Sequence, residues 1–171
     1  MSAAIPTLTT DRLTLRGATA ADFDAYAATL ADARSQYMGG PYTRRGAWDM
    51  FCNMTAQWQL SGYGGWIIET DQGFAGEIAF WHPPHFPEPE LGWTLTAQAE
   101  GHGYACEAAR AALVWYWANT DAVTVVSYID PKNARSIALA TKLGAQPDPD
   151  GPWAKGENAA NTTVYRHRRP S

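Results

Sequence analysis

Residues 91–105 read LGWTLTAQAEGHGYA, an apolar run followed by a glycine-rich turn and the start of an alanine-rich stretch. The run predicts a β-strand over Glu90 to Leu95, and the stretch from Gly101 to Trp117 predicts a long helix whose alanines allow close packing on a sheet. Gly101 and Gly103 stand where the two meet. Glycines there let backbone N–H groups converge, and the positive end of a helix attracts an anion. The stretch therefore predicts a turn that can hold phosphates.

Two familiar nucleotide-binding turns fit this stretch poorly. A dinucleotide-binding turn would place a third glycine three residues after Gly103, where Cys106 stands, and would open a repeated βαβ pattern. The longer phosphate loop that ends in Gly-Lys-Ser/Thr does not occur in the sequence. The remaining interpretation is a pyrophosphate carrier bound by a mixed sheet.

Hydrophobic periodicity places the other elements around this turn. Before it, the pattern predicts a strand over Arg12–Arg16, helices over Ala20–Asp32 and Thr43–Leu60, and a hairpin of strands Gly65–Thr70 and Phe74–Trp81. After it, the pattern predicts a buried strand over Val123–Tyr128, a helix opened by Asp130 and Pro131 and closed by Gly144, and a last strand over Thr162–Arg166. In the helix over Thr43–Leu60 an aromatic stripe predicts core packing, or a wall of the substrate pocket.

Composition limits the classes to which the chain can belong. Of its 171 residues 46% are hydrophobic and 18% are charged, which is typical of one globular domain over residues 1–171. The net charge of -4 gives no general attraction to nucleic acid. The sequence has no leader pattern and no apolar stretch long enough to cross a bilayer, so we expect a cytoplasmic protein without a membrane partner.

The middle of the chain is purely acidic. Between Arg45 and Arg110 there is no Lys or Arg, while eight carboxylates fall inside the interval: Asp49, Glu69, Asp71, Glu77, Glu88, Glu90, Glu100 and Glu107. One interpretation is a solvated negative face; the other is a site that receives a cationic acceptor such as an amine.

Three motifs resemble a known family. The segment Gln98–Ala105 matches the Gln/Arg-x-x-Gly-x-Gly/Ala signature of GNAT N-acetyltransferases. The segment Asn133–Ala145 is similar to the Asn-x-x-Ser…Lys-Leu-Gly-Phe helix of the RimJ/RimL-type branch, which acetylates protein N-termini and small amines, and Thr10–Arg16 resembles the start of that branch. The resemblance spans nearly the whole chain in the right order.

This resemblance implies a fold and an activity. The fold is the α/β (α+β type) GNAT fold, a single mixed, mostly antiparallel twisted sheet of 6 to 7 strands flanked by about four helices. The activity is transfer of an acetyl group from acetyl-CoA, the co-substrate, to a small-molecule amine or a peptide N-terminus by direct attack in a ternary complex, with no metal. A homodimer is also implied. A non-catalytic acyl-CoA-binding module of the same fold is the alternative.

The resemblance also assigns residues to the cofactor. Backbone groups of Trp93, Thr94 and Leu95 would pair with the pantetheine arm, where the sheet splays open. The pyrophosphate would be held by Gln98, Gly101, His102, Gly103, Tyr104 and Ala105. Asn133 would bind the pantetheine, or else cap its helix. The candidate cations for the nucleotide phosphates are Lys132, Arg135, Lys142 and Arg110.

The chemistry needs a base and a proton for the leaving thiolate. Glu90 is the preferred base and Glu77 the alternate, although either could be a carboxylate that merely faces outward from a strand. Ser136 would donate to the thiolate, since Ala140 stands where many members of the family have a tyrosine; the alternative is a serine that only caps the helix. His82 and His85 suggest either a substrate-facing loop or a metal site.

Overall fold

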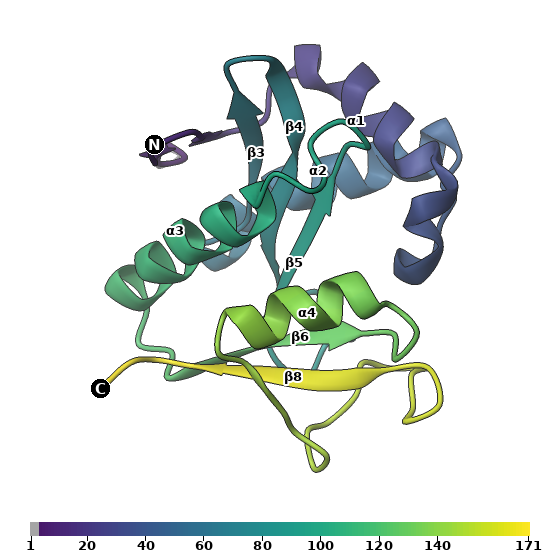
Figure 1. The fold of residues 1–171 in the computed structure, drawn as a ribbon, viewed down its shortest axis with the longest axis vertical. Coiled ribbons are helices and arrows are strands. Elements are labelled where there is room, and N and C mark those ends of the chain that lie inside the picture. Colours follow the sequence, from purple (N-terminus) through teal and green to yellow (C-terminus); the bar gives the residue numbers. More distant parts are fainter. Residues whose placement is uncertain (1–3) are drawn as a thin grey trace.

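One twisted sheet of eight strands organises residues 4–171, the part of the chain that the computed structural model describes (Figure 1). The strand order is β1-β2-β3-β4-β5-β6-β8-β7, and every pairing is antiparallel except that of β5 with β6. The strands are β1 (Leu8–Thr9), β2 (Thr14–Arg16), β3 (Gly65–Thr70), β4 (Gly73–Trp81), β5 (Glu90–Leu95), β6 (Thr124–Ile129), β7 (Gln146–Pro147) and β8 (Thr163–Arg168). The expected mixed, mostly antiparallel class is confirmed; the additional strands beyond the expected number are short ones.

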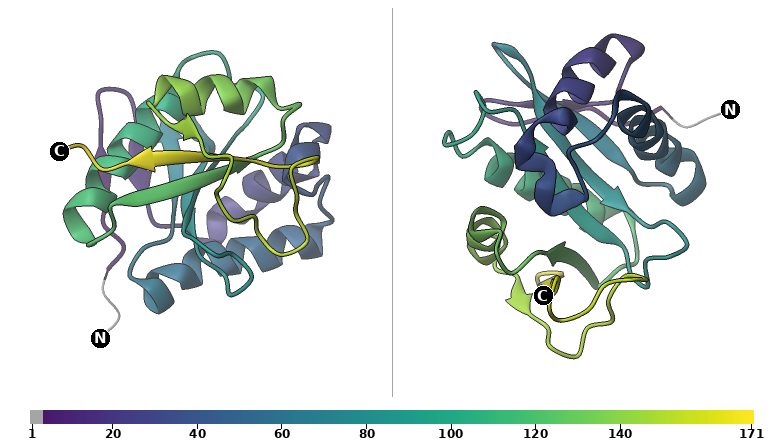
Figure 2. Two further views of the ribbon diagram at one scale, coloured as in Figure 1. Left: turned by 90° about the horizontal axis from the view of Figure 1, so that it is seen from below. Right: turned by 90° about the vertical axis from the view of Figure 1, so that its right-hand side faces the viewer.

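Helices cover both faces of this sheet (Figure 2). They are η1 (Ala20–Asp22), α1 (Phe23–Ala31), η2 (Ala33–Met38), α2 (Arg44–Ser61), α3 (Tyr104–Asn119) and α4 (Ala134–Lys142). On one face α1 and α2 enclose a core around Tyr26, Met54 and Ile67. On the other face α3 packs over a larger core that includes Trp66 and Tyr116, and α4 lies beside α3 against β6.

Strand alternation follows from these two cores. In β4, Ile78 and Phe80 enter the core under α3, whereas Ala79 and Trp81 pack on the side of α1 and α2. Glu77 has the same parity as Ala79 and therefore lies on the face of α1 and α2. The β4–β5 register pairs Trp81 with Glu90 and Glu77 with Thr94, so the side chains of both carboxylates extend from one face.

Helix boundaries differ from the expected ones at two important places. We expected the helix after the glycine turn to begin at Gly101, but α3 begins at Tyr104 because Gly101 and Gly103 both adopt a left-handed φ of 80°. We expected Asp130 to cap the last helix, but Asn133 is its N-cap and α4 begins at Ala134. Asp130 instead closes a preceding turn, in which its carboxylate accepts from the backbone N–H of Lys132 at 2.7 Å.

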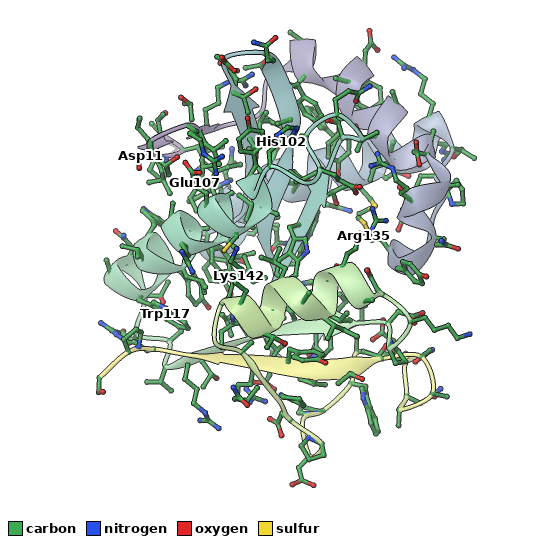
Figure 3. The ribbon with its side chains drawn as sticks, viewed as in Figure 1. Asp11, His102, Glu107, Trp117, Arg135 and Lys142 are labelled. Atoms are coloured by element: carbon green, nitrogen blue, oxygen red, sulfur yellow. The ribbon has the colours of Figure 1, made fainter. Side chains whose placement is uncertain are left out.

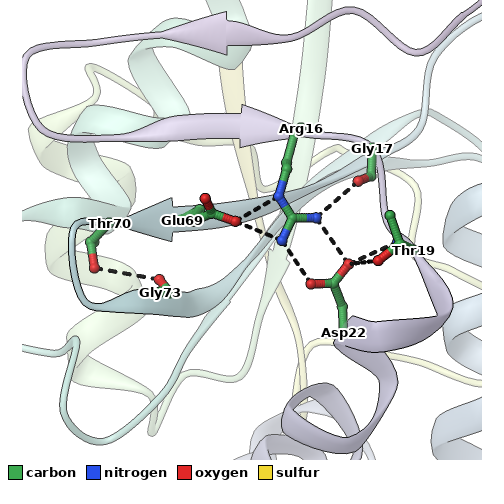
Figure 4. Close-up of polar contacts among 7 residues, drawn as sticks. All are labelled: Arg16, Gly17, Thr19, Asp22, Glu69, Thr70 and Gly73. Carbon is green, nitrogen blue, oxygen red and sulfur yellow. Dashed lines mark hydrogen bonds and ion pairs between the residues drawn. The ribbon is translucent and has the colours of Figure 1, made fainter.

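Arg16 joins the first strands to the first helical turn (Figure 4). Its guanidinium donates to Glu69 on β3 at 2.6 Å and to both carboxylate oxygens of Asp22 at 2.8 and 2.9 Å. Thr19 donates to the same Asp22 side chain from its backbone N–H and its hydroxyl. Asp22 is buried, and the Arg16 guanidinium lowers its pKa to about 2. This network fixes β2, β3 and η1 relative to one another.

Candidate active site

The sheet opens between β5 and β6. Their parallel ladder has one pairing, Glu90 with Val126, after which the strands diverge, as Figure 1 shows by the large angle between β5 and the β6–β8 pair. Within residues 4–171 the β6-side edge of β5 from Gly92 to Leu95 pairs with no strand. An unpaired strand edge is a template for an extended ligand, because its N–H and C=O groups remain available.

Hydrogen bonds connect β5, β6 and β8 at the point where β5 and β6 separate. Ser127 on β6 donates from its hydroxyl to the Leu91 carbonyl oxygen at 2.7 Å, and the backbone N–H of Tyr128 donates to the Glu90 carboxylate at 3.3 Å. Ser127 Oγ also lies 3.0 Å from Nε2 of His167 on β8. A carbonyl oxygen only accepts, so the serine proton goes to Leu91 and the bond to His167 must come from its Nε2–H. The neutral form of His167 therefore carries its proton on Nε2, and burial lowers the pKa of the ring to about 4.

A cleft of about 740 Å³ lies at this opening. Its acidic residues are Glu77, Glu90, Asp130 and Glu157, and among the lining residues of the described chain there is no Lys or Arg. Its aromatic residues are Tyr37, Tyr42, Trp81, Phe86, Trp93 and Tyr128. Carboxylates and aromatic faces both attract cations, so the cleft favours a positively charged ligand.

Glu90 and Glu77 have different surroundings within this cleft. Glu90 is partly exposed, and desolvation raises the pKa of its carboxyl to about 8. Glu77 is only 3% exposed, its carboxylate has long 3.5 Å contacts with the hydroxyls of Tyr26 and Thr94, and burial raises its pKa to about 7. The register places the two residues four positions apart along the strands, about 13 Å.

The predicted phosphate turn is exposed and open. Gly101, His102 and Gly103 are exposed, and a Cβ at Gly101 would meet no heavy atom within 4 Å. Arg12 secures the turn by donating to the His102 carbonyl at 2.9 Å and pairing with Glu107 in the first turn of α3. Figure 3 labels His102 and Glu107 near this end of α3. The turn therefore presents backbone amides to solvent at a helix N-terminus, as an anion site requires.

The first turn of α4 forms the opposite wall of the cleft. Asn133 Oδ1 accepts from the Ser136 backbone N–H at 3.2 Å, so Asn133 caps the helix, and its amide NH2 group donates to no described residue. Ser136 Oγ accepts from the indole Nε1–H of Trp93 at 3.3 Å. The alternative in which Ser136 serves only as a cap does not hold, since Asn133 performs that function. Ala140, one turn further along α4, is fully buried.

The other candidate residues lie outside this grouping or serve different contacts. Arg135 pairs with Glu100 of the phosphate turn, whereas Lys142 lies at the other end of α4 beside an open groove that also contains Arg110 (Figure 3). His82 Nδ1 lies 3.2 Å from the Tyr63 hydroxyl. In the described part of the chain, no group of three or more His, Cys, Asp or Glu side chains is arranged to hold a metal ion. None of its helices has the length and apolarity that a membrane crossing requires.

Six of the eight carboxylates in the acidic interval have one of two functions, whereas Asp49 and Asp71 are exposed. Four of its carboxylates form ion pairs with arginines from outside the interval: Glu69 with Arg16, Glu88 with Arg166, Glu100 with Arg34 and Arg135, and Glu107 with Arg12. Glu77 and Glu90 line the cleft. In the aromatic stripe of α2, Phe51, Met54 and Trp58 pack into the cores as expected, whereas Trp48 is 46% exposed. A different side of α2 contributes Met50, Asn53, Gln57 and Leu60 to the cleft.

Several residues of the site are not predicted by the sequence. Ser127 stands in the middle of a largely apolar strand, a signal that could have marked it. His167 lies in a basic RHRR run that resembles a surface tail. The family resemblance assigns only the backbone of Trp93, so the contact of its side chain with Ser136 is visible only in the fold.

The family model described as an acetyltransferase (GNAT) domain matches residues 12–146 of this chain. The chain belongs to the GNAT acetyltransferases. An acetyltransferase from Agrobacterium tumefaciens str. C58 has a structure with 40% sequence identity and a TM-score of 0.90, over 99% of this chain and 98% of that one. The protein is thus an acetyl-CoA-dependent N-acetyltransferase, as the motifs predicted.

More distant GNAT structures share the fold. A Salmonella typhimurium acetyltransferase that modifies the N-terminal serine of ribosomal protein L7/L12 is 17% identical, with a TM-score of 0.75 over 94% of this chain and 97% of that one. A RimL enzyme solved in complex with coenzyme A is 16% identical, with a TM-score of 0.73 over 95% and 98% of the two chains. Both structures therefore share the GNAT fold with this acetyltransferase.

Proposed function

We propose that this GNAT protein acetylates the primary amine of a cationic small molecule or a peptide N-terminus by direct attack on acetyl-CoA within a ternary complex. The observation that carries the proposal is the opening between β5 and β6, which leads into a cleft lined by Glu90, Ser136 and carboxylates but by no described Lys or Arg. Acetyl-CoA supplies the activated thioester.

The residues present suit acetyl-CoA. The exposed amides around Gly101 and Gly103 would bind the pyrophosphate, and the free edge of Trp93 to Leu95 would pair with the pantetheine. Asn133 would donate its free amide group to the same arm. Gln98, His102, Tyr104 and Ala105 complete the proposed turn, in which His102 stacks on Tyr104 with ring centroids 5.4 Å apart.

Proton transfer assigns a role to Glu90. In the proposed reaction the amine nitrogen bonds to the acetyl carbon, and the carbon–sulfur bond breaks with its electron pair on sulfur. An ammonium acceptor first loses one proton to Glu90, directly or through water. After the nitrogen–carbon bond forms, the nitrogen loses a second proton to solvent, and Glu90 gives its proton to solvent as well. Ser136 supplies a proton to the sulfur and regains one from solvent, so each turnover releases one proton.

The free energy of deprotonation favours acceptors of low pKa. At pH 7 an α-amino group with a pKa of about 7.8 needs about 1 kcal/mol to lose its proton, whereas a lysine-type amine needs about 4.6 kcal/mol. The pKa of Glu90, raised to about 8, matches an α-amino group closely. Glu77 is the alternate base, although its side chain is almost fully enclosed.

A panel of acceptors tests the proposal. We expect N-terminal peptides and cationic amines to release free thiol from acetyl-CoA, while matched neutral compounds without an amine release none above the background hydrolysis rate. Acetyl-CoA binding without any amine-dependent release would support the non-catalytic module instead. We also propose that residues 1–171 act as one catalytic domain and that two copies form a homodimer, which light scattering tests independently.

A further inference from the structure

The Trp93 indole links two elements that diverge at the cleft. Trp93 extends from β5, its partly buried ring packs against both the core under α3 and the small cluster around Ala140, and its Nε1–H reaches Ser136 Oγ on α4 at 3.3 Å. The bond therefore spans the opening between β5 and the first turn of α4.

The chemistry of the indole group determines which residue donates in this hydrogen bond. Indole Nε1–H is a donor only, so Ser136 Oγ is the acceptor and its own proton is not used in this contact. Within residues 4–171 no acceptor takes that proton. A serine hydroxyl within a helix commonly donates to a backbone carbonyl one turn earlier, but the described residues give Ser136 Oγ only the contact with Trp93.

We propose that Trp93 is a positioning residue for the acetyl transfer. Its indole N–H occupies one lone pair of Ser136 Oγ and so directs the hydroxyl proton away from the ring and into the cleft, toward the sulfur that leaves. This inference rests on the proposed donation from Ser136. It assigns to the Trp93 side chain a function separate from the pairing of its backbone with pantetheine.

A double-mutant cycle tests the coupling between the two residues. Trp93→Phe keeps a ring and removes the donor, so we expect kcat to fall about 3- to 10-fold, the range of one hydrogen bond, with the KM for acetyl-CoA changed less than about 2-fold. Ser136→Ala should lower kcat more, by about 100-fold. Adding Trp93→Phe to Ser136→Ala should then lower kcat no further, because the indole acts through the hydroxyl.

The matched control is Trp58→Phe. Trp58 donates its indole N–H to the Gly65 carbonyl at 2.8 Å outside the cleft, so this change removes a comparable bond and should leave kcat unaltered. Equal losses from Trp93→Phe in the presence and absence of Ser136 would overturn the inference, as would an unchanged kcat in either single variant. Amine-dependent turnover by the wild-type protein tests the proposed acetyl transfer separately. Failure of the Trp93 inference therefore does not contradict the proposed function.

A second substitution covers the case in which Trp93→Phe does not fold. Trp93→benzothienylalanine keeps the bicyclic shape and replaces the indole N–H by sulfur. We expect the same drop in kcat with an unchanged unfolding temperature. Wild-type kcat in this variant would contradict the inference.

Discussion

The Glu90 carboxylate accepts a hydrogen bond from the Tyr128 backbone N–H at 3.3 Å, beside the single pairing of Glu90 with Val126 that ends the β5–β6 ladder. One carboxylate thus completes the sheet at its opening and enters the cleft. Burial of this group raises its pKa to about 8, despite the N–H donor that favours its charged form.

Replacing Glu90 by Gln should remove the base. We expect kcat/KM to fall by about 100-fold or more, since general base catalysis commonly contributes that much. The wild-type kcat/KM should rise with pH as Glu90 ionises near pH 8. In Glu90→Gln the rise should follow only the pKa of the acceptor amine, about 10.4 for a lysine-type acceptor. Steady-state rates between pH 6 and 9.5 measure both effects.

The same substitution should make the protein more stable in alkali. The pKa of Glu90 is higher in the folded than in the unfolded chain, so wild-type stability falls as pH rises through about 4.5 to 8. Urea unfolding at several pH values measures this difference.

Glu69→Gln is the control for the rate measurements, because Glu69 pairs with Arg16 outside the cleft. A pH–rate profile altered equally by Glu69→Gln and Glu90→Gln would exclude Glu90 as the base.

Gly101→Ala should weaken binding of coenzyme A. A side chain at a left-handed φ costs about 1 to 2 kcal/mol, which the turn would relieve by rotating its amides away from the phosphates. Gly62→Ala is the matched control: Gly62 has a φ of 77°, its Cβ position is equally open, and it ends α2 outside the cleft. Calorimetry should show weaker affinity only for Gly101→Ala, and equal affinities for both variants would refute the phosphate turn.

His167 should make the fold sensitive to mild acid. Its pKa is about 4 in the folded chain and about 6.5 when unfolded, so the unfolded state binds the extra proton between these values. The free energy of unfolding should therefore drop by about 3 kcal/mol as pH falls from 6.5 to 4. Urea unfolding at several pH values should show this loss in the wild type and in His82→Gln, an exposed control, but much less of it in His167→Gln.

Asp22 should make stability depend on pH in a second, more acidic range. The Arg16 guanidinium lowers its pKa to about 2, so the stability that it provides is complete above about pH 4 and disappears as pH falls through 2. The Asp22 carboxylate should contribute about 2 kcal/mol to the free energy of unfolding. Asp22→Asn should lose this amount at pH 5 and resemble the wild type near pH 1.5; comparable stability of the two proteins at pH 5 would disprove the role of this ion pair.

The sequence was most informative where local chemistry decides structure. The run from Glu90 to Leu95 and the hairpin strands were located almost to the residue, because alternation and turn residues act locally. The predicted start of α4 was wrong. Asp130 and Pro131 are residue types that often begin a helix, but the side chain that accepts a backbone N–H of the first turn is that of Asn133. Two competing caps differ by contacts that the sequence does not display.

The remaining features depend on contacts between distant segments. Nothing in the sequence near Ser127 indicates that it bonds to Leu91 and His167, 36 and 40 residues away. The divergence of β5 from β6 likewise results from packing of whole elements. The sequence could therefore nominate Glu90 and Ser136 from family resemblance, whereas the cleft that both line is apparent only in the fold.

A crystal structure with bound coenzyme A would show whether the glycine turn and the opening between β5 and β6 form the cofactor site. We expect the pyrophosphate on the amides of Gly101 and Gly103, the pantetheine along Trp93 to Leu95, and the sulfur within hydrogen-bond distance of Ser136 Oγ on the side of the cleft that Glu90 lines. Coenzyme A bound elsewhere, or a sulfur remote from both Ser136 and Glu90, would contradict it.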